Sequence, residues 1–298
     1  MYALDQLFTA LRQPRFVLTE LNRLWYGRLG RRPYNPAGID VFAEDWDTLV
    51  ILDACRHDVF AESVAGSDWA DSLESRQSRG SATREWIRAN FTERELHDTV
   101  YLDANGYYGR LKDEIGAQVY KYILVENDAF GGISVHPDKV TDAALDTVER
   151  FPDKRLIVHY MQPHQPFFGP SATDIDHAAG FEETVRRNDL DDETIRRCYR
   201  ENVDIVLESV RRLVGELDGR TVVTADHGEI LGDPQTPIPV GHYGHPARLY
   251  VPELVEVPWL VHQSGPRRTV TAERPTRDEV GLDADELDEK LRNLGYAV

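Results

Sequence analysis

The pattern of apolar and polar positions divides the chain into short apolar runs and longer amphipathic stretches. Residues 48–52 (TLVIL) form a continuous apolar run, which is typical of a strand buried on both faces of a parallel sheet. Residues 221–224 (TVVT) are β-rich, and they follow residues 199–217, where apolar side chains recur at helical spacing. A strand that is reached through a crossover helix predicts an α/β domain.

Other segments extend this pattern. Further strands are expected at residues 99–102, 117–124, 155–161 and 257–261, and further helices at 84–91, 140–151 and 278–296. Residues 170–198 are polar and charged. This predicts a surface insertion with a helix at its end, lying over the crevice where open α/β sheets bind ligands. Because 298 residues of 41% hydrophobic composition can bury one sizeable core, we expect a single domain over residues 46–298.

The N-terminal residues 1–32 differ in charge from the rest of the chain, because six arginines face only Asp5 and Glu20. Apolar residues recur at helical spacing on both sides of Pro14, which predicts two short helices. The ordinary interpretation is that these helices pack on the domain. The alternative is a basic amphipathic arm that rests on an anionic membrane or partner. Residues 1–45 are thus predicted to be a basic helical arm and an irregular segment leading into the domain.

The composition is strongly acidic, with a formal net charge of −18 and basic residues that are almost all arginine. Such a surface is typical of halophilic proteins, which work in concentrated cytoplasmic salt. It argues against nucleic acid as the substrate, because binding a phosphate backbone requires a basic face. Cys55 and Cys198 form no disulfide or CxxC pattern. We expect a soluble cytoplasmic protein, since no run approaches the roughly 18 apolar residues of a membrane helix and no secretory signal is present.

A metal-binding pattern occurs where two predicted strands end. Asp226 and His227 stand side by side after one strand, and Gly228 permits a tight turn immediately behind them. A carboxylate oxygen beside an imidazole nitrogen is a common ligand pair for a divalent cation. Asp53 ends the other central strand, and open α/β sheets place ligands at such ends. Alone, Asp53 could cap the next helix; with the later pair, it is interpreted as a third ligand.

Two hydroxyl groups precede the helix predicted at residues 84–91. Ser81 and Thr83 lie where free backbone N–H groups can bind an oxyanion and help to ionise a hydroxyl. The alternative is that one of them only caps this helix, with Glu85 as the partner in a capping box.

Three histidines lie in loops that are expected near the same end of the sheet. His164 stands between two prolines just after the strand predicted at residues 155–161, so its imidazole is presented from a stiff loop. His242 and His245 are three residues apart in the Gly-rich stretch GHYGHP. A lone histidine is usually structural, but the position of His164 favours a function.

Several motifs occur in an order that is typical of one superfamily. LDACRHD, YMQPHQPF, TADHGEILG, GHYGHP ahead of LVEVPWLV, and a closing LRNLGYAV resemble the sulfatase branch of the alkaline phosphatase superfamily. The similarity covers residues 46–298, and the ADHGE segment with an upstream strand-end Asp is its more specific part. It implies a sulfatase-like catalytic domain with an alkaline phosphatase-like fold, a three-layer α/β/α architecture around a central, mostly parallel sheet.

The resemblance also implies roles for the candidate residues. Asp53, Asp226 and His227 match metal ligands. Ser81 matches the nucleophile, whose hydroxyl would also bind the metal, and Thr83 is the second choice for this role.

The remaining candidates match residues that handle the substrate. Arg56 falls where related proteins carry an arginine near the anion. His164, with His242 or His245, matches positions that contact substrate oxygens or protonate the leaving group.

Two departures from the family pattern bear on the chemistry. Neither Cys55 nor Cys198 lies in a Cys-x-Pro-Ser-Arg sequence, so the formylglycine of true arylsulfatases cannot be made by that route. This favours phosphate esters over sulfate esters. The Asp-x-x-x-His pattern that supplies a second metal in two-zinc members is missing around residues 159–164. One divalent metal ion, Mn, Zn, Ca or Mg, is therefore favoured over two.

These observations predict a metal-dependent hydrolase or transferase that acts on small-molecule or lipid-linked phosphate (or sulfate) esters through a Ser or Thr nucleophile. The alternative is a non-catalytic, metal-containing binding protein for an anionic sugar or lipid headgroup, because function is set by the site and not by the fold.

Overall fold

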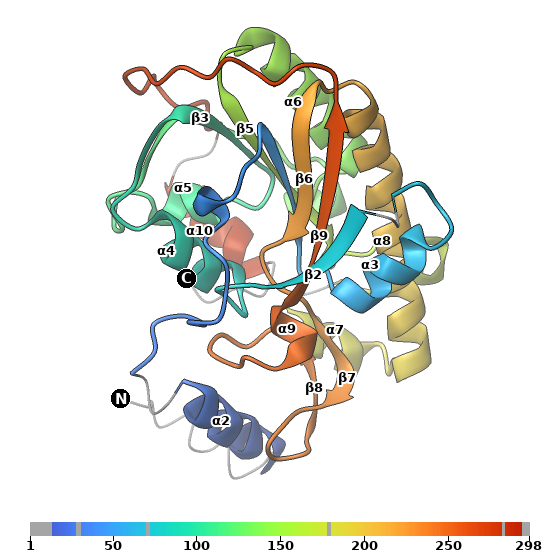
Figure 1. Cartoon of the computed structure of the whole chain (residues 1–298). Helices are drawn as coiled ribbons and strands as arrows, with labels where there is room; N and C mark the ends of the chain where they lie inside the picture. The colour runs from blue at the N-terminus through green and yellow to red at the C-terminus, as the bar shows by residue number, and fades with distance from the viewer. Residues whose placement is uncertain (1–13, 28–30, 70–71, 178–179, 282–283, 294–298) are drawn as a thin grey trace.

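A seven-stranded sheet runs through the molecule in the order β2-β9-β6-β1-β5-β3-β4 (Figure 1). The computed structural model describes residues 14–27, 31–69, 72–177, 180–281 and 284–293. The strands are β1 (Thr48–Asp53), β2 (Leu73–Gln77), β3 (Glu95–Asp103), β4 (Gln118–Leu124), β5 (Arg155–Pro163), β6 (Gly219–Ala225) and β9 (Glu256–Ser264). The run from β6 to β4 is parallel, whereas β9 and β2 join antiparallel at one edge. The predicted mostly parallel sheet is confirmed.

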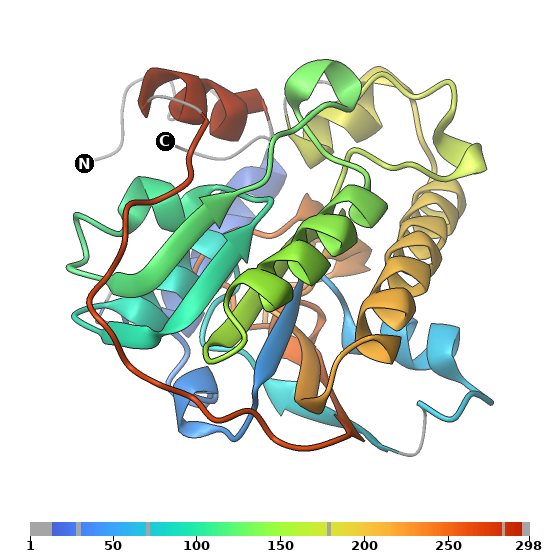
Figure 2. The same cartoon turned by 90° about the horizontal axis from the view of Figure 1, so that it is seen from above.

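Helices cover both faces of the sheet (Figure 2). One layer contains α3 (His57–Val64), α6 (Pro137–Arg150) and α8 (Asp192–Gly215), and the other contains α4 (Thr83–Phe91), α5 (Tyr107–Leu111) and α10 (Ala284–Asn293). Neighbouring side chains of β5 reach different layers, as the pleat requires. The hydroxyl of Tyr160 lies 2.7 Å from that of Thr141 in α6, whereas the ring of His159 packs against Trp86 in α4. The three-layer α/β/α architecture is thus confirmed.

Several smaller elements complete the fold. They are a two-stranded sheet of β7 (Ile230–Pro234) and β8 (Gly241–Gly244), the helices α7 (Phe181–Arg187) and α9 (Pro252–Val255), and the 3-10 turns η1 (Val41–Ala43), η3 (Phe130–Gly132) and η4 (Pro170–Ala172). The sequence analysis did not predict β2, β7 or β8. These strands are short and carry no continuous apolar run, so their residues resemble polar loops.

Helix boundaries follow from capping. Helix α8 begins earlier than expected, because the Asp191 side chain accepts a hydrogen bond of 2.8 Å from the Thr194 amide and caps the first turn. The expected surface insertion at residues 170–198 contains η4, α7 and this first turn. Of the tail helix predicted at residues 278–296, residues 284–293 form α10, whereas residues 278–281 are not helical and Glu279 forms a β-bridge with Ile123.

The helix α2 (Pro14–Tyr26) is the described part of the N-terminal arm, and its first residue is Pro14, a favoured residue in the first helical turn. The helix predicted over residues 4–11 lies outside the described residues. None of the helices in the described ranges combines the length and the apolar character that a bilayer-spanning segment requires.

Candidate metal centre

Two neighbouring strands bring Asp53, Asp226 and His227 together. Because β1 and β6 are parallel and paired from Thr48 and Thr221 to Leu52 and Ala225, they end at the same edge of the sheet. All three side chains are fully buried there. The Nε2 atom of His227 lies 3.3 Å from Asp226 Oδ2 and 3.7 Å from Asp53 Oδ1. The structure thus assembles the three residues that the strand ends predicted, and one ligand atom from each could hold a single ion.

Backbone groups fix the orientation of this cluster. Asp226 Oδ1 accepts hydrogen bonds from the amides of Ala54, at 3.1 Å, and His227, at 2.9 Å. Ala54 has a φ of 61°, an uncommon conformation for a residue other than glycine, and this turn directs its N–H towards Asp226. Gly228 was expected to permit a tight turn. In the structure it is required because a Cβ atom at this position would overlap the carbonyl oxygen of Glu253.

The tautomer of His227 follows from its neighbours. Its Nδ1 atom lies 2.8 Å from the carbonyl oxygen of Gly228, which can only accept, so Nδ1 carries the proton. The Nε2 atom therefore presents a lone pair to the carboxylates. Asp226 Oδ2, 3.3 Å away, accepts no hydrogen bond of good geometry from the described residues. Two electron-rich atoms that face each other in a buried site fit a bound cation, which would satisfy both.

The electrostatics of the cluster also fit a cation. Burial would raise the pKa of Asp226, but His227 and His159, with a contribution from Thr83, hold it below its usual value. Burial lowers the pKa of His227 against the opposing effect of Asp226, and this shift favours the neutral imidazole that a metal ligand requires.

The two candidate hydroxyls have different surroundings. Thr83, the first residue of α4, places its Oγ1 atom 3.1 Å from His227 Nε2. Ser81 lies before the helix, and its Oγ atom bonds to Glu85 Oε2 and to the carbonyl oxygen of Pro246, both at 3.1 Å. The structure therefore brings Thr83, the second choice from the sequence, to the cluster, whereas the Ser81 hydroxyl bonds to Glu85 and Pro246. Ser81 does not cap α4, whose N-cap is Ala82, but the Glu85 carboxylate also accepts from the Ser81 amide.

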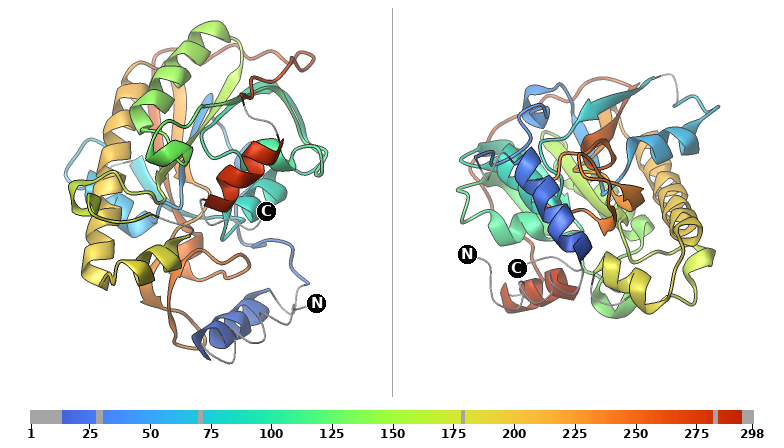
Figure 3. Two further views of the ribbon diagram at one scale, coloured as in Figure 1. Left: turned by 180° about the vertical axis from the view of Figure 1, so that it is seen from behind. Right: turned by 90° about the horizontal axis from the view of Figure 1, so that it is seen from below.

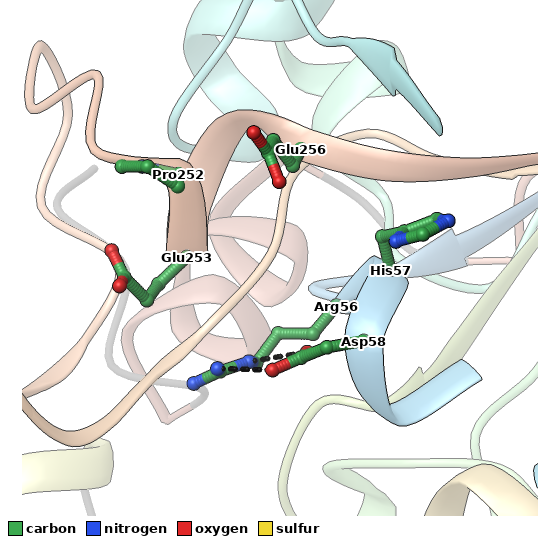
Figure 4. Close-up of a pocket in the computed structure, with 6 residues that line it drawn as sticks. All are labelled: Arg56, His57, Asp58, Pro252, Glu253 and Glu256. Carbon is green, nitrogen blue, oxygen red and sulfur yellow. Dashed lines mark hydrogen bonds and ion pairs between the residues drawn. The ribbon is translucent and has the colours of Figure 1, made fainter. Parts of the chain in front are cut away.

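Arg56 is held beside the centre by other carboxylates. Its guanidinium forms ion pairs with Asp58, at 2.6 Å, and Asp233, at 2.7 Å, and a hydrogen bond of 3.3 Å to the Glu229 carbonyl oxygen. It lines a cavity of about 220 Å³ together with His57, Asp58, Pro252, Glu253 and Glu256 (Figure 4). The arrangement shows no direct contact between Arg56 and the Asp53 cluster, so the anion-binding role expected for it stays a prediction.

A second cluster lies next to the first and consists of His164, Glu229 and His245. One ligand atom from each lies within 4.8 Å of the others. His164 Nδ1 donates to the Gln165 carbonyl oxygen at 2.6 Å, and His245 Nδ1 lies 3.0 Å from Glu229 Oε1. The rings of His245 and His227 are 4.4 Å apart, which joins the two clusters.

Burial sets the protonation of this second cluster. It raises the pKa of Glu229 to about 7 and lowers the pKa values of His164 and His245 to about 4. The group could hold a second cation or contact the substrate and protonate the leaving group. Sequence reasoning missed Glu229, although it lies three residues after Asp226 in the ADHGE motif.

His242 is separate from both clusters in its contacts. Its Nδ1 atom lies 3.4 Å from Glu182 Oε2 in α7, and burial lowers its pKa to about 4. Of the two histidines in the GHYGHP loop, the structure thus brings His245 to the centre, and His242 faces α7.

Polar residues from β3 and β5, which the sequence analysis did not single out, support the ligands. Asn105 donates to Asp53 Oδ2 at 2.6 Å. The hydroxyl of Tyr101 lies 2.9 Å from His159 Nδ1, and His159 Nε2 lies 4.0 Å from Asp226 Oδ2. If Tyr101 donates this bond, the His159 proton is on Nε2 and faces Asp226. Asn105 could have been identified from the sequence, because polar residues in the loop after a predicted strand often line the ligand crevice.

We predict that Tyr101→Phe weakens metal binding, because it removes the hydroxyl that sets the His159 tautomer beside Asp226. The expected loss of affinity is about 10-fold to 100-fold, the usual cost of removing an outer hydrogen-bonding partner. Isothermal titration of the metal-free protein measures it. Tyr160→Phe is the control, since it removes a buried hydroxyl on the opposite face of the sheet. Equal affinity in both variants would show that Tyr101 has only a packing role.

Comparisons with known proteins show the fold. No protein-family model and no curated protein sequence matches the chain. The C-terminal periplasmic domain of EcEptC from Escherichia coli is similar, with a TM-score of 0.50, 15% identity and coverage of 73% of this chain and 72% of that chain. The same domain has a structure in complex with Zn, with a TM-score of 0.48, 16% identity and the same coverage.

A third solved structure is larger than this chain. It is the integral membrane protein lipooligosaccharide phosphoethanolamine transferase A from Neisseria meningitidis, with a TM-score of 0.43 and 15% identity. The match covers 73% of this chain and 47% of that chain, so this chain spans about half of its length. The likeness to the EcEptC domain is one of fold alone, and it agrees with the α/β/α architecture that the motifs implied.

Proposed function

We propose that the chain is a metal-dependent hydrolase or transferase that acts on phosphate or sulfate esters, with Thr83 as the nucleophile. One observation carries the proposal: the Thr83 hydroxyl lies 3.1 Å from His227 Nε2, in a buried cluster with Asp53 and Asp226 at the carboxyl ends of two parallel strands. The four residues together offer the donor atoms that Mn, Zn, Ca or Mg accepts, and the fit supports one ion at this position.

The ion, when bound, would lower the pKa of the Thr83 hydroxyl and neutralise charge on the non-bridging oxygens of the ester. The protein supplies the rest of the reaction. Thr83 lies in the first turn of α4, where free N–H groups and the helix dipole stabilise developing negative charge. The Ser81–Glu85 hydrogen bonds hold the preceding loop, so Thr83 is presented in one orientation.

In the chemical step the Thr83 hydroxyl gives up its proton to water, and Thr83 Oγ1 attacks the phosphorus or sulfur atom while the bond to the leaving oxygen breaks. We infer that the proton for the leaving oxygen comes from the second cluster. Glu229, with a pKa raised to about 7 by burial, holds a proton in part of the molecules at neutral pH and lies 3.0 Å from His245 Nδ1. His164, at the same cluster, would contact the substrate oxygens. Water or an acceptor alcohol then removes the group from Thr83.

The proposal predicts turnover that depends on metal. The purified chain is assayed with p-nitrophenyl phosphate, bis-p-nitrophenyl phosphate and p-nitrophenyl sulfate, with each of the four candidate ions. We expect activity on a phosphate ester that exceeds activity on the sulfate, because the chain lacks a formylglycine sequence. A chelator should remove this activity, and added metal should restore it. Stoichiometric metal binding without turnover of any ester would instead favour the binding-protein alternative.

The physiological ester is proposed to be either a small molecule or a lipid-linked compound. The acidic composition supports a halophilic, cytoplasmic setting for this activity. Membrane contact through residues 1–32 would favour a lipid-linked ester over a small molecule. The orientation of α2 on the protein is therefore relevant to the choice between these two substrate classes.

A further inference from the structure

The outer face of α2 carries an exposed apolar stripe. Val17, Leu21 and Trp25 are spaced four residues apart, so they lie on one face of the helix. Their side chains are 40%, 46% and 68% exposed. Among the described residues the only other large apolar side chains exposed to this degree are Phe130, at 38%, and Val280, at 38%, and these lie singly. A contiguous stripe of this kind marks an interaction surface.

The opposite face of α2 is fixed to the protein by polar contacts. Asn22 is fully buried and exchanges two hydrogen bonds with the Ile238 backbone, of 2.9 and 3.0 Å. Arg23 donates to the Ala247 carbonyl oxygen at 2.7 Å, and the Tyr26 hydroxyl lies 2.8 Å from that of Thr236. A surface helix ordinarily turns its apolar face inward. Here, the buried Asn22 and the packing of Tyr26 on Tyr250 anchor the helix, and its apolar stripe faces out. The ordinary interpretation of the arm did not anticipate this orientation.

The net charge of the N-terminal segment indicates which kind of surface the stripe would contact. Residues 1–32 contain six arginines and two acidic residues and carry +4, so the other residues carry −22 of the total of −18. On α2 itself, Arg15 pairs with Glu182 and Arg23 with Glu20. Arg31 and Arg248 are exposed, and Arg248 packs against Gly27 at the end of α2. An apolar stripe with Trp and Leu on a segment of net positive charge is complementary to an anionic lipid surface. An anionic lipid surface would repel the rest of this acidic protein. The repulsion would orient the protein with α2 towards the membrane.

The anchored helix lies beside the loop that carries the second cluster. Ala247, which binds Arg23, is two residues after His245. In Figure 1, α2 lies below β7, β8 and α9, and Figure 3 shows from behind and from below that it stays on this side of the molecule. A membrane that contacts the stripe would therefore lie on the side of the β7–β8 hairpin and the His245 loop.

We propose that α2 docks the protein on an anionic bilayer through Val17, Leu21 and Trp25, and that the ester group it acts on is carried by a lipid. The docking proposal depends only on the exposed stripe of α2 and the charge of its segment. The choice of a lipid-borne ester also depends on the proposed function.

Flotation of the full chain with vesicles tests the docking. We expect the protein to float with vesicles that contain phosphatidylglycerol and much less with phosphatidylcholine alone. Trp25→Glu should reduce the bound fraction at least about tenfold, because it places a charge in the inserted stripe. Val280→Glu is the matched control, since it changes the charge equally at an exposed apolar residue away from α2. Both sites are exposed, so both variants should fold, which circular dichroism verifies.

Three outcomes would overturn the docking. They are absence of flotation, equal flotation of Trp25→Glu and the unmodified chain, and a dimer in solution that Trp25→Glu dissociates, which would assign the stripe to a second copy. Turnover distinguishes the two proposals. Docking without hydrolysis of any ester would remove the proposed function and leave the docking, whereas hydrolysis of soluble esters without flotation would do the opposite. Docking together with turnover confined to soluble esters would overturn the lipid-borne substrate.

Discussion

Thr83→Ala is expected to reduce turnover on a phosphate ester by about 10⁴-fold or more, the scale seen when a covalent nucleophile is removed. The reason is local, because Thr83 Oγ1 is the hydroxyl that lies 3.1 Å from His227 Nε2. Thr83→Ser keeps the hydroxyl and should retain most of the activity. Steady-state kinetics with saturating metal measures the loss. Mass spectrometry of quenched reactions should find the transferred group on the peptide that contains Thr83.

Ser81→Ala is the matched control for this experiment. It removes a buried hydroxyl two residues away, whose partners are Glu85, Pro246 and the Leu249 amide, at 3.2 Å. We expect a loss of stability of about 1–3 kcal/mol, because the Leu249 amide loses its acceptor in a buried position. We expect a change in turnover far smaller than that of Thr83→Ala. If Ser81→Ala were the inactive variant and Thr83→Ala remained active, the assignment of the nucleophile would be wrong.

The fold and the grouping of Asp53, Asp226 and His227 could be predicted because both depend on strands. A buried run such as residues 48–52 is recognisable from its apolar residues alone, and parallel strands end at one edge of the sheet. Asp53, Asp226 and His227 follow from that rule, since each lies at or just after such an end. Polar edge strands such as β2 and the β7–β8 hairpin offered no apolar run, so local pattern could not identify them.

The choice between Ser81 and Thr83 could not be made from sequence. Both precede or begin a helix and both can serve as caps, and they differ only in what the folded chain places beside them. Glu85 and the Pro246 carbonyl bind Ser81, and Pro246 is 165 residues away in the chain. Likewise, Glu229 meets His164 only because β5 and the segment after β6 end together. Side-chain pairing across such separations is set by tertiary packing, which short motifs do not encode.

The arm shows a different limit. Helical spacing predicted an amphipathic helix at α2, and a helix is present. The direction of its apolar face could not be predicted, because Leu21 and Trp25 would suit a core as well as a membrane. The contacts of Asn22 explain the observed orientation of the helix. Its side-chain amide forms two hydrogen bonds with the Ile238 backbone, so the polar face of α2 lies against the protein.

Asp226→Asn is expected to abolish tight metal binding and to lower turnover by about 10³-fold or more, since a bound cation supplies several kcal/mol to the transition state. The substitution is nearly isosteric. Its amide oxygen can keep the hydrogen bonds from the Ala54 and His227 amides at Oδ1, while an N–H group replaces Oδ2, the atom that faces His227 Nε2. The fold should therefore persist while the charge that holds the cation is lost.

Thermal unfolding separates this effect from misfolding. Metal at 100 times its dissociation constant stabilises the unmodified chain by about 2.7 kcal/mol, so a chelator should lower its Tm by several degrees. The same chelator should leave the Tm of Asp226→Asn unchanged. In the absence of metal, the variant should be somewhat less stable than the unmodified chain near neutral pH, because the lowered pKa of Asp226 means that the fold stabilises its charged form. A variant that still responds to the chelator and keeps its turnover would place the essential cation elsewhere.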